Sequence, residues 1–236
     1  NAALLHIEDG IARITLNRPD RLNAFDAEMA EAWAETTQAA VADPAVKAII
    51  VAAEGRAFCA GGDVRAMSEM PDRNEGIRTL AERINEGLAA LVESSKPVVA
   101  AAHGTTAGGG LGVLLSTDYA VVGESSKIGS LYAGVGLTPD LSVSALLARA
   151  VGERRALQMT LQETMLSAQE ALDWGLAAEV VPDGEVLARA EVIAAHWAAN
   201  PHAYGQAKRL IRSQPSRSFR EQLSEEARTI GQASVT

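Results

Sequence analysis

The apolar residues of this chain form short strand-like runs separated by stretches with helical spacing. Leu4–Glu8 and Ile11–Asn17 flank Asp9-Gly10, and two β-like runs around Asp-Gly predict a hairpin. Val46–Ala53 and Pro97–Ala102 are apolar runs rich in Val, Ile and Ala, which predict buried strands. A further strand is expected at Tyr119–Val122.

Helical spacing fills the segments between these strands. Asp26 is a suitable N-cap for a helix that ends at Asp43-Pro44, and apolar residues at intervals of three and four predict a second helix over Gly76–Val92. The recurring order of strand, glycine-rich bend and helix predicts an α/β fold with crossover connections. From about Leu141 the pattern is almost wholly helical, with predicted helices at Leu141–Ala150, Arg154–Leu161, Ala168–Trp174, Asp183–Ala199, His202–Arg212 and Ser218–Ile230.

Composition excludes several classes of function. The 236 residues are 47% hydrophobic and carry a net charge of −9, so a sizeable core is expected and non-specific binding to nucleic acid is not. No apolar stretch is long enough to span a bilayer, and the start of the chain has no signal-peptide pattern, so no membrane partner is expected. The single cysteine excludes an internal disulfide and suits a cytoplasmic location.

The chain contains two glycine-rich bends, AFCAGGD at 57–63 and AGGGLG at 107–112. Cys59 has no neighbouring histidine signature, so we interpret it as a small buried hydrophobic residue; the histidines also lack zinc-ligand spacing, and no metal is expected. Neither bend matches a nucleotide-phosphate motif. A third interpretation uses both bends: free backbone N–H groups near Gly62 and Gly109, each where a helix begins, could form an oxyanion hole.

Four motifs carry a resemblance to a known family. NRPDRLNAF (17–25), GRAFCAGGDV (55–64), KPVVAAAHGTTAGGGLG (96–112) and SAQEALDWGLAAEVV (167–181) occur in the order and spacing of the enoyl-CoA hydratase/isomerase (crotonase) superfamily. The resemblance implies a spiral core of ββα repeats over residues 1–196 and a helical C-terminal oligomerisation region over 197–236, which is expected to be incomplete. It also implies a homotrimer or a dimer of trimers, an acyl-CoA substrate, and no cofactor beyond the coenzyme A of that substrate.

The resemblance also assigns roles to individual residues. The oxyanion amides are expected at Gly62 and Gly109, as the two bends already suggest. The residues expected to contact coenzyme A or the acyl group are Arg21, Leu22, Ala24, Ala60, Asp63, Val64, Gly112 and Val135. Asp63 is also a suitable N-cap for a short helix over Val64–Met70.

The residue that moves the proton is less directly indicated. Typical hydratases of the family hold water with two glutamates, and the matching positions here are Gly112 and Tyr132. Asp140 is the remaining candidate, because isomerases of the family carry an acid at the matching position. Asp140 could equally be an ordinary acid in the first turn of a helix capped by Thr138. Apolar neighbours would raise its pKa and a helix terminus would lower it.

Several functions are compatible with these residues. The favoured hypothesis is an acyl-CoA double-bond isomerase in which Asp140 carries the proton and Tyr132 covers one side of the acyl group or donates a hydrogen bond to it. A loop tyrosine that only packs its ring is an equally good interpretation of Tyr132. The alternatives are an enoyl-CoA hydratase, a 4-chlorobenzoyl-CoA dehalogenase-like hydrolase, a non-catalytic acyl-CoA binder and a purely structural oligomer.

Overall fold

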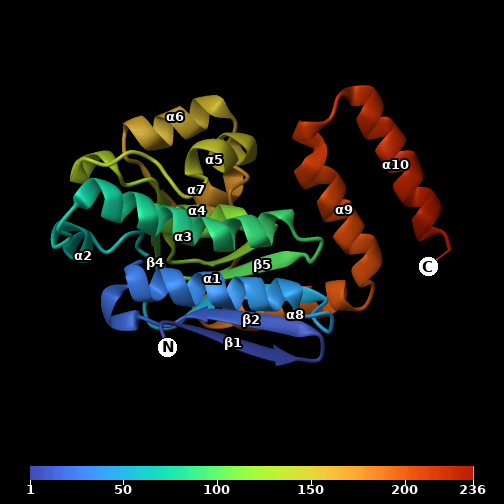
Figure 1. Cartoon of the computed structure of the whole chain (residues 1–236), viewed down its shortest axis with the longest axis horizontal. Coiled ribbons are helices and arrows are strands. Elements are labelled where there is room, and N and C mark those ends of the chain that lie inside the picture. Colours follow the sequence, from blue (N-terminus) through green and yellow to red (C-terminus); the bar gives the residue numbers. More distant parts are fainter. Residues whose placement is uncertain (236) are drawn as a thin grey trace.

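The larger of two β-sheets extends from the lower edge of the molecule towards its middle in the view of Figure 1. The computed structural model describes residues 1–235. The sheet has six strands in the order β1 (Ala3–Glu8), β2 (Ile11–Leu16), β3 (Ala48–Ala53), β5 (Val98–Ala102), β7 (Tyr119–Gly123) and β10 (Glu179–Val181). The predicted hairpin at Asp9-Gly10 joins β1 to β2, and β1 is antiparallel to β2, whereas the other pairings are parallel.

The two faces of this sheet bury different sets of side chains. Successive residues of a strand point to opposite faces. Ile49 and Val51 of β3 therefore lie in the main core, while Ala48, Ile50 and Ala52 pack against helix α8 (Val186–Ala198). Alanines on this side allow α8 to lie close to the strands, which suits a chain with few aromatic residues.

A second, smaller sheet carries the two glycine-rich bends. Its strands are β4 (Ala57–Cys59), β6 (Thr105–Ala107), β8 (Lys127–Gly129) and β9 (Met165–Ser167), of which the first three run parallel. Successive passes of the chain place one strand in each sheet and then a helix, as in β5, β6 and α4. The predicted spiral of ββα repeats is thus confirmed, and it forms two mixed sheets.

The remaining helices cover the sheets and extend beyond them. Helices α1 and α3 pack against each other beside the core. The helices are α1 (Ala27–Ala42), α2 (Val64–Ser68), α3 (Arg73–Glu93), α4 (Gly109–Ser116), α5 (Val143–Val151), α6 (Glu153–Leu161), α7 (Ala168–Asp173), α8, α9 (Pro201–Ser213) and α10 (Phe219–Ala233).

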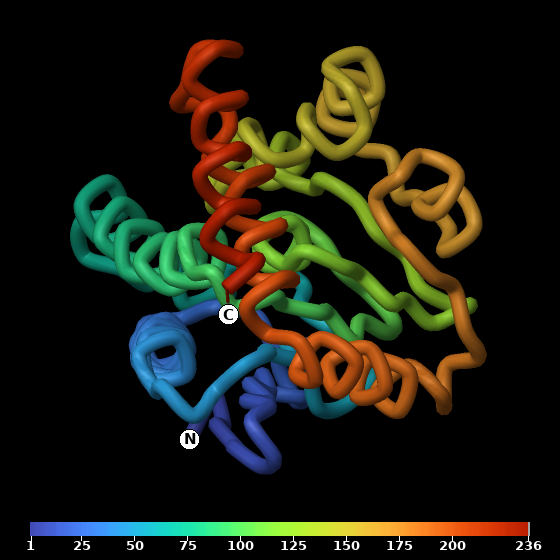
Figure 2. The backbone as a smooth tube through the Cα atoms, turned by 90° about the vertical axis from the view of Figure 1, so that its right-hand side faces the viewer, coloured from blue at the N-terminus to red at the C-terminus, as the bar shows by residue number. Residues whose placement is uncertain are grey.

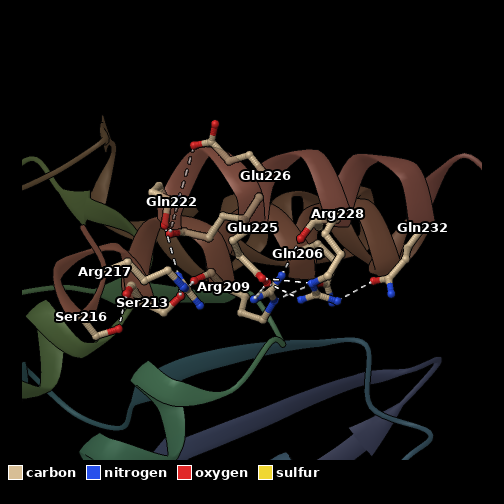
Figure 3. Close-up of polar contacts among 12 residues, drawn as sticks. Gln206, Arg209, Ser213, Ser216, Arg217, Gln222, Glu225, Glu226, Arg228 and Gln232 are labelled. Atoms are coloured by element: carbon tan, nitrogen blue, oxygen red, sulfur yellow. Dashed lines mark hydrogen bonds and ion pairs between the residues drawn. The ribbon is translucent and has the colours of Figure 1, made fainter. Parts of the chain in front are cut away.

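The last two helices form an antiparallel hairpin at one side of the core (Figures 1 and 2). Arg209 of α9 donates a hydrogen bond to Glu225 of α10 at 2.6 Å (Figure 3). It also donates to Thr229 of α10 at 2.8 Å. Buried Lys208 anchors α9 to the core, because its Nζ lies 2.9 Å from Asp118 and donates to the carbonyl of Leu91 at 2.6 Å. The predicted role of residues 197–236 in oligomerisation stays a prediction.

Two predictions about the second half of the chain are wrong. Strands β9 and β10 lie in the region predicted to be almost wholly helical. Each has only three residues, too few to show a strand period, and each adds to the edge of an existing sheet. The helix predicted from Leu141 begins at Val143, because Leu141 and Ser142 adopt left-handed backbone conformations.

Candidate active site

Three parallel strands of the small sheet end at one edge, and each end carries a segment of the candidate site. Ala60–Gly62 follows β4, Gly108-Gly109 follows β6 and Ser130–Tyr132 follows β8. The carboxyl ends of parallel strands are a common location for ligand sites in α/β proteins. The two predicted bends therefore converge because β4 and β6 are hydrogen-bonded neighbours.

Glycine at position 61 allows the two bends to touch. Its φ of 103° is unfavourable for residues with a Cβ, and a Cβ there would lie 3.0 Å from the Ala107 carbonyl oxygen and 3.1 Å from the Gly109 nitrogen. The backbone of the first bend thus lies directly beside the first residue of α4.

The backbone amides of Gly62 and Gly109 are both free. Phe25 forms a parallel bridge to Gly62 by donating to the Gly61 oxygen at 2.7 Å and accepting from Asp63 N at 2.8 Å. This bridge leaves the Gly62 N–H on the other side, and Gly109 as the first residue of α4 has no intrahelical acceptor. Neither N–H donates a hydrogen bond to any group of residues 1–235, and both glycines line one cavity.

This cavity has a volume of about 390 Å³ and a mostly apolar wall. Helix α3 contributes Ile77, Leu80, Ala81 and Ile84, and Val135 comes from the loop after β8. Among the described residues that line the cavity, the only acidic side chain is Asp140.

Asp140 and Tyr132 form a hydrogen-bonded pair inside the cavity. The Tyr132 hydroxyl donates to Asp140 Oδ1 at 2.9 Å. Burial raises the pKa of Asp140 above its ordinary value, and the hydrogen bond from Tyr132 offsets part of that rise. Burial, followed by the negative charge of Asp140, raises the pKa of Tyr132, so the tyrosine stays protonated as the donor. Because the carboxyl is held in a partly dry site, it is a suitable proton acceptor at neutral pH.

The interpretation of Asp140 as a first-turn residue of a helix is wrong. Helix α5 starts at Val143 with Ser142 as its N-cap, and Asp140 lies before the cap, where its backbone oxygen accepts from Val143 N at 2.9 Å. The sequence left open whether burial, which raises the pKa of Asp140, or a helix terminus, which lowers it, has the larger effect. In the structure burial has the larger effect.

The residues predicted to contact coenzyme A divide into two groups. Ala60, Val64 and Val135 line the cavity together with the free amides. Arg21, Leu22, Ala24 and Asp63 lie outside its lining, in the adjoining segment before Phe25 and at the start of α2. The side chain of Arg21 is exposed at the end of the short 3-10 turn Pro19–Arg21.

Two further predicted residues have clear structural positions. Asp63 caps α2, as predicted, by accepting a hydrogen bond from Ala66 N at 3.1 Å. Gly112 lies outside the cavity lining and packs against the backbone of Leu141, so closely that a Cβ on Gly112 would overlap the Leu141 carbonyl oxygen.

Two residues that the sequence analysis did not single out hold the first motif in place. The Arg18 guanidinium lies 2.7 Å from Asp26 and 3.5 Å from Asp63, which ties the start of α1 to the start of α2. Asn23 is fully buried, has a φ of 55° and donates to the carbonyl of Ala57 at 2.8 Å. Asparagine tolerates left-handed backbone better than most residues, and that preference was the available sequence signal.

Cys59 is not placed for nucleophilic chemistry. Its thiol is fully buried and donates to the carbonyl of Asn23 at 3.2 Å, and burial raises its pKa to about 12. The interpretation as a small buried hydrophobic residue is confirmed. Within residues 1–235 no group of three or more His, Cys, Asp or Glu side chains could hold a metal ion, and no helix is long and apolar enough to cross a membrane.

The two mixed sheets and the helical C-terminal region are those of the crotonase fold. The sequence agrees: the model of the Enoyl-CoA hydratase/isomerase family matches residues 6–234, and the chain belongs to this family. The family implies an acyl-CoA substrate.

Individual relatives catalyse different reactions. The chain is 33% identical over 226 residues to 1,2-epoxyphenylacetyl-CoA isomerase of Escherichia coli strain K12, covering 93% of this chain and 85% of that protein. It is 32% identical over 206 residues to 4-chlorobenzoyl coenzyme A dehalogenase-2 of an Arthrobacter species, covering 86% and 75%. A crystal structure from Mycobacterium abscessus described as an enoyl-CoA hydratase/isomerase superposes with a TM-score of 0.95 at 33% identity, covering 100% of this chain and 92% of that one.

Proposed function

We propose that this protein moves a carbon–carbon double bond within an acyl-CoA thioester. The proposal rests on the groups that line the cavity: two free backbone amides, and Asp140 as the single acidic side chain among the described lining residues. One carboxyl can take a proton from one carbon and return it to another. Addition of water across a double bond is better served by a second carboxyl that holds the water.

The proposed reaction needs no group beyond those in the cavity. The amides of Gly62 and Gly109 bind the thioester oxygen of a 3-enoyl-CoA. The Asp140 carboxylate removes a proton from the α-carbon, and the C–H electron pair passes into the thioester to form a dienolate whose oxygen charge the amides stabilise. Asp140 then returns the proton to the γ-carbon, which yields the 2-enoyl thioester. Tyr132 orients Asp140 through its hydrogen bond.

The coenzyme A moiety is proposed to extend from the cavity along the first motif. Ala60 and Val64 line the cavity, and Arg21 offers an exposed guanidinium that suits a phosphate group. The backbone around Leu22 and Ala24 is held beside the first bend, because Leu22 O accepts from Ala60 N at 3.0 Å.

The test is incubation of the protein with a panel of 3-enoyl-CoA thioesters in deuterated water. A 2-enoyl product that carries deuterium is the expected result. Crotonyl-CoA and 4-chlorobenzoyl-CoA are incubated in parallel: a 3-hydroxyacyl product from crotonyl-CoA would show a hydratase instead, and chloride released from 4-chlorobenzoyl-CoA would show a dehalogenase. Tight thioester binding without turnover or deuterium uptake across the panel would contradict an enzymatic role and favour the non-catalytic binder.

A further inference from the structure

The turn formed by residues 140–142, here called the Asp140 turn, has an unusual backbone conformation. Leu141 and Ser142 have φ values of 49° and 68°, which residues with a Cβ rarely adopt. Ser142 is the N-cap of α5, yet its hydroxyl makes no cap hydrogen bond, and its Oγ is buried without a partner among residues 1–235. Local preferences of these residues therefore do not explain the turn, and its surroundings must hold it.

Helix α4 provides those surroundings through two glycines on one of its faces. Gly109 and Gly112 are three residues apart, so both face the Asp140 turn. A Cβ on Gly112 would overlap the Leu141 carbonyl oxygen, and a Cβ on Gly109 would lie 2.6 Å from Leu141 Cδ1. Leu141 is 4% exposed, so its backbone and its side chain are both fixed against this glycine face.

Leu141 thus connects two groups of the proposed mechanism. It is bonded to Asp140, whose carboxyl carries the proton, and it packs on Gly109, whose amide binds the thioester oxygen. We infer that Leu141 is a positioning residue: packed against Gly109 and Gly112, it sets the separation between the Asp140 carboxyl and the Gly109 amide. This inference rests on the proposed function.

That separation matters because both groups act on the same small part of the substrate. The thioester oxygen and the α-carbon are two bonds apart, so a bound oxygen fixes where the proton acceptor must lie. An error of about 1 Å in such a placement can lower the rate by about 10²-fold. A change at Leu141 should therefore lower kcat far more than it weakens binding.

Two substitutions at Leu141 separate positioning from simple stability. Leu141→Ala removes the side chain that packs on Gly109, and the left-handed backbone strain remains. Leu141→Gly removes the same side chain and also the strain, because glycine adopts positive φ freely. Leu141→Gly should therefore have the higher Tm of the two variants and the lower kcat, since glycine leaves the Asp140 turn less constrained.

The experiment measures kcat, KM and Tm for isomerisation of a 3-enoyl-CoA, with deuterium uptake into the 2-enoyl product as a second readout. Leu141→Ala is expected to lower kcat about 10- to 100-fold while KM changes less than about 3-fold. Leu141→Met, which fills similar space, should restore most of kcat. The control is Leu147→Ala, since Leu147 is 2% exposed on α5 and lies outside the cavity lining; it should lower Tm and leave kcat unchanged.

The possible outcomes separate this inference from the proposed function. If kcat follows Tm, so that Leu141→Gly is more active than Leu141→Ala, Leu141 is only structural and the inference is overturned. Unchanged kcat in both variants overturns it as well and leaves the proposed function intact. A wild-type protein with neither isomerisation nor deuterium uptake overturns the proposed function, and the inference with it.

Discussion

Asp140→Asn should remove activity and at the same time stabilise the folded protein. Asparagine has the shape of aspartate, and its amide oxygen can still accept the 2.9 Å hydrogen bond from Tyr132, so the substitution removes mainly the charge. Loss of a general base typically lowers kcat about 10²- to 10⁴-fold. A half-buried carboxyl with a raised pKa is less stable as an anion than in water, so its removal should raise the Tm at pH 7. Single stabilising substitutions typically add about 0.5–2 kcal/mol, which is a few °C in Tm for a chain of this size.

The pH dependence of this stabilisation follows from the direction of the pKa shift. Burial raises the pKa of Asp140 above 3.8, so the folded protein binds the proton more tightly than the unfolded chain. The stability that this proton contributes is present below the ordinary pKa and is lost as the pH rises through the raised one. Wild type and Asp140→Asn should therefore have similar stability near pH 4, and the variant should gain an advantage towards pH 7.

Thermal melts from pH 4 to pH 8 and steady-state kinetics measure both effects. The control is Asp173→Asn, because Asp173 is exposed and its Oδ1 accepts a comparable 2.9 Å hydrogen bond from Gln169. An advantage for Asp140→Asn that is equal at pH 4 and pH 7 would contradict burial of the charge as the cause. Wild-type kcat in Asp140→Asn would remove Asp140 from the mechanism.

Two further substitutions test other contacts. Tyr132→Phe removes the hydrogen bond that lowers the pKa of Asp140, so the acid limb of the kcat–pH profile should move to higher pH. An acid limb that stays in place or moves to lower pH would show that Tyr132 does not lower the pKa of Asp140. Lys208→Met leaves buried acceptors unpaired, although Asp118 keeps its ion pair with Arg212 at 3.0 Å. The free energy of unfolding, measured in urea, should therefore fall by about 3 kcal/mol. A fall of less than about 1 kcal/mol would mean that Lys208 does not anchor α9.

The long elements and the family could be predicted from the sequence because their signals are local and repeated. The Asp9-Gly10 hairpin and the central strands follow from turn chemistry and apolar runs, and the predicted helix over 76–92 lies within α3. The two glycine bends were identified as a pair because a strand end, a glycine and a helix start occur together twice. That the two bends meet in space was a hypothesis from the residues, and the motifs of the family supported it.

The small sheet could not be predicted, although it brings the site together. Strands β4, β6 and β8 have three residues each, and each is followed by a bend or loop segment, so no period of two is visible. The start of α5 was misplaced for a related reason. Thr138-Pro139-Asp140 has the local pattern of a helix start, but packing of Leu141 on Gly112 delays the helix to Val143.

The energetics of the Asp140 turn support the role proposed for Asp140. Two consecutive non-glycine residues in left-handed conformations cost about 1–2 kcal/mol each, and the buried Ser142 hydroxyl and the half-buried Asp140 carboxyl add further cost. Asparagine at position 140 would avoid the cost of the half-buried charge, so stability alone does not account for the acid. Packing against Gly109 and Gly112 and the hydrogen bond from Tyr132 to Asp140 hold the turn in place, with the one acidic side chain of the described lining in the cavity that the two free amides also line. The cost is therefore concentrated at the residues that the proposed proton transfer requires.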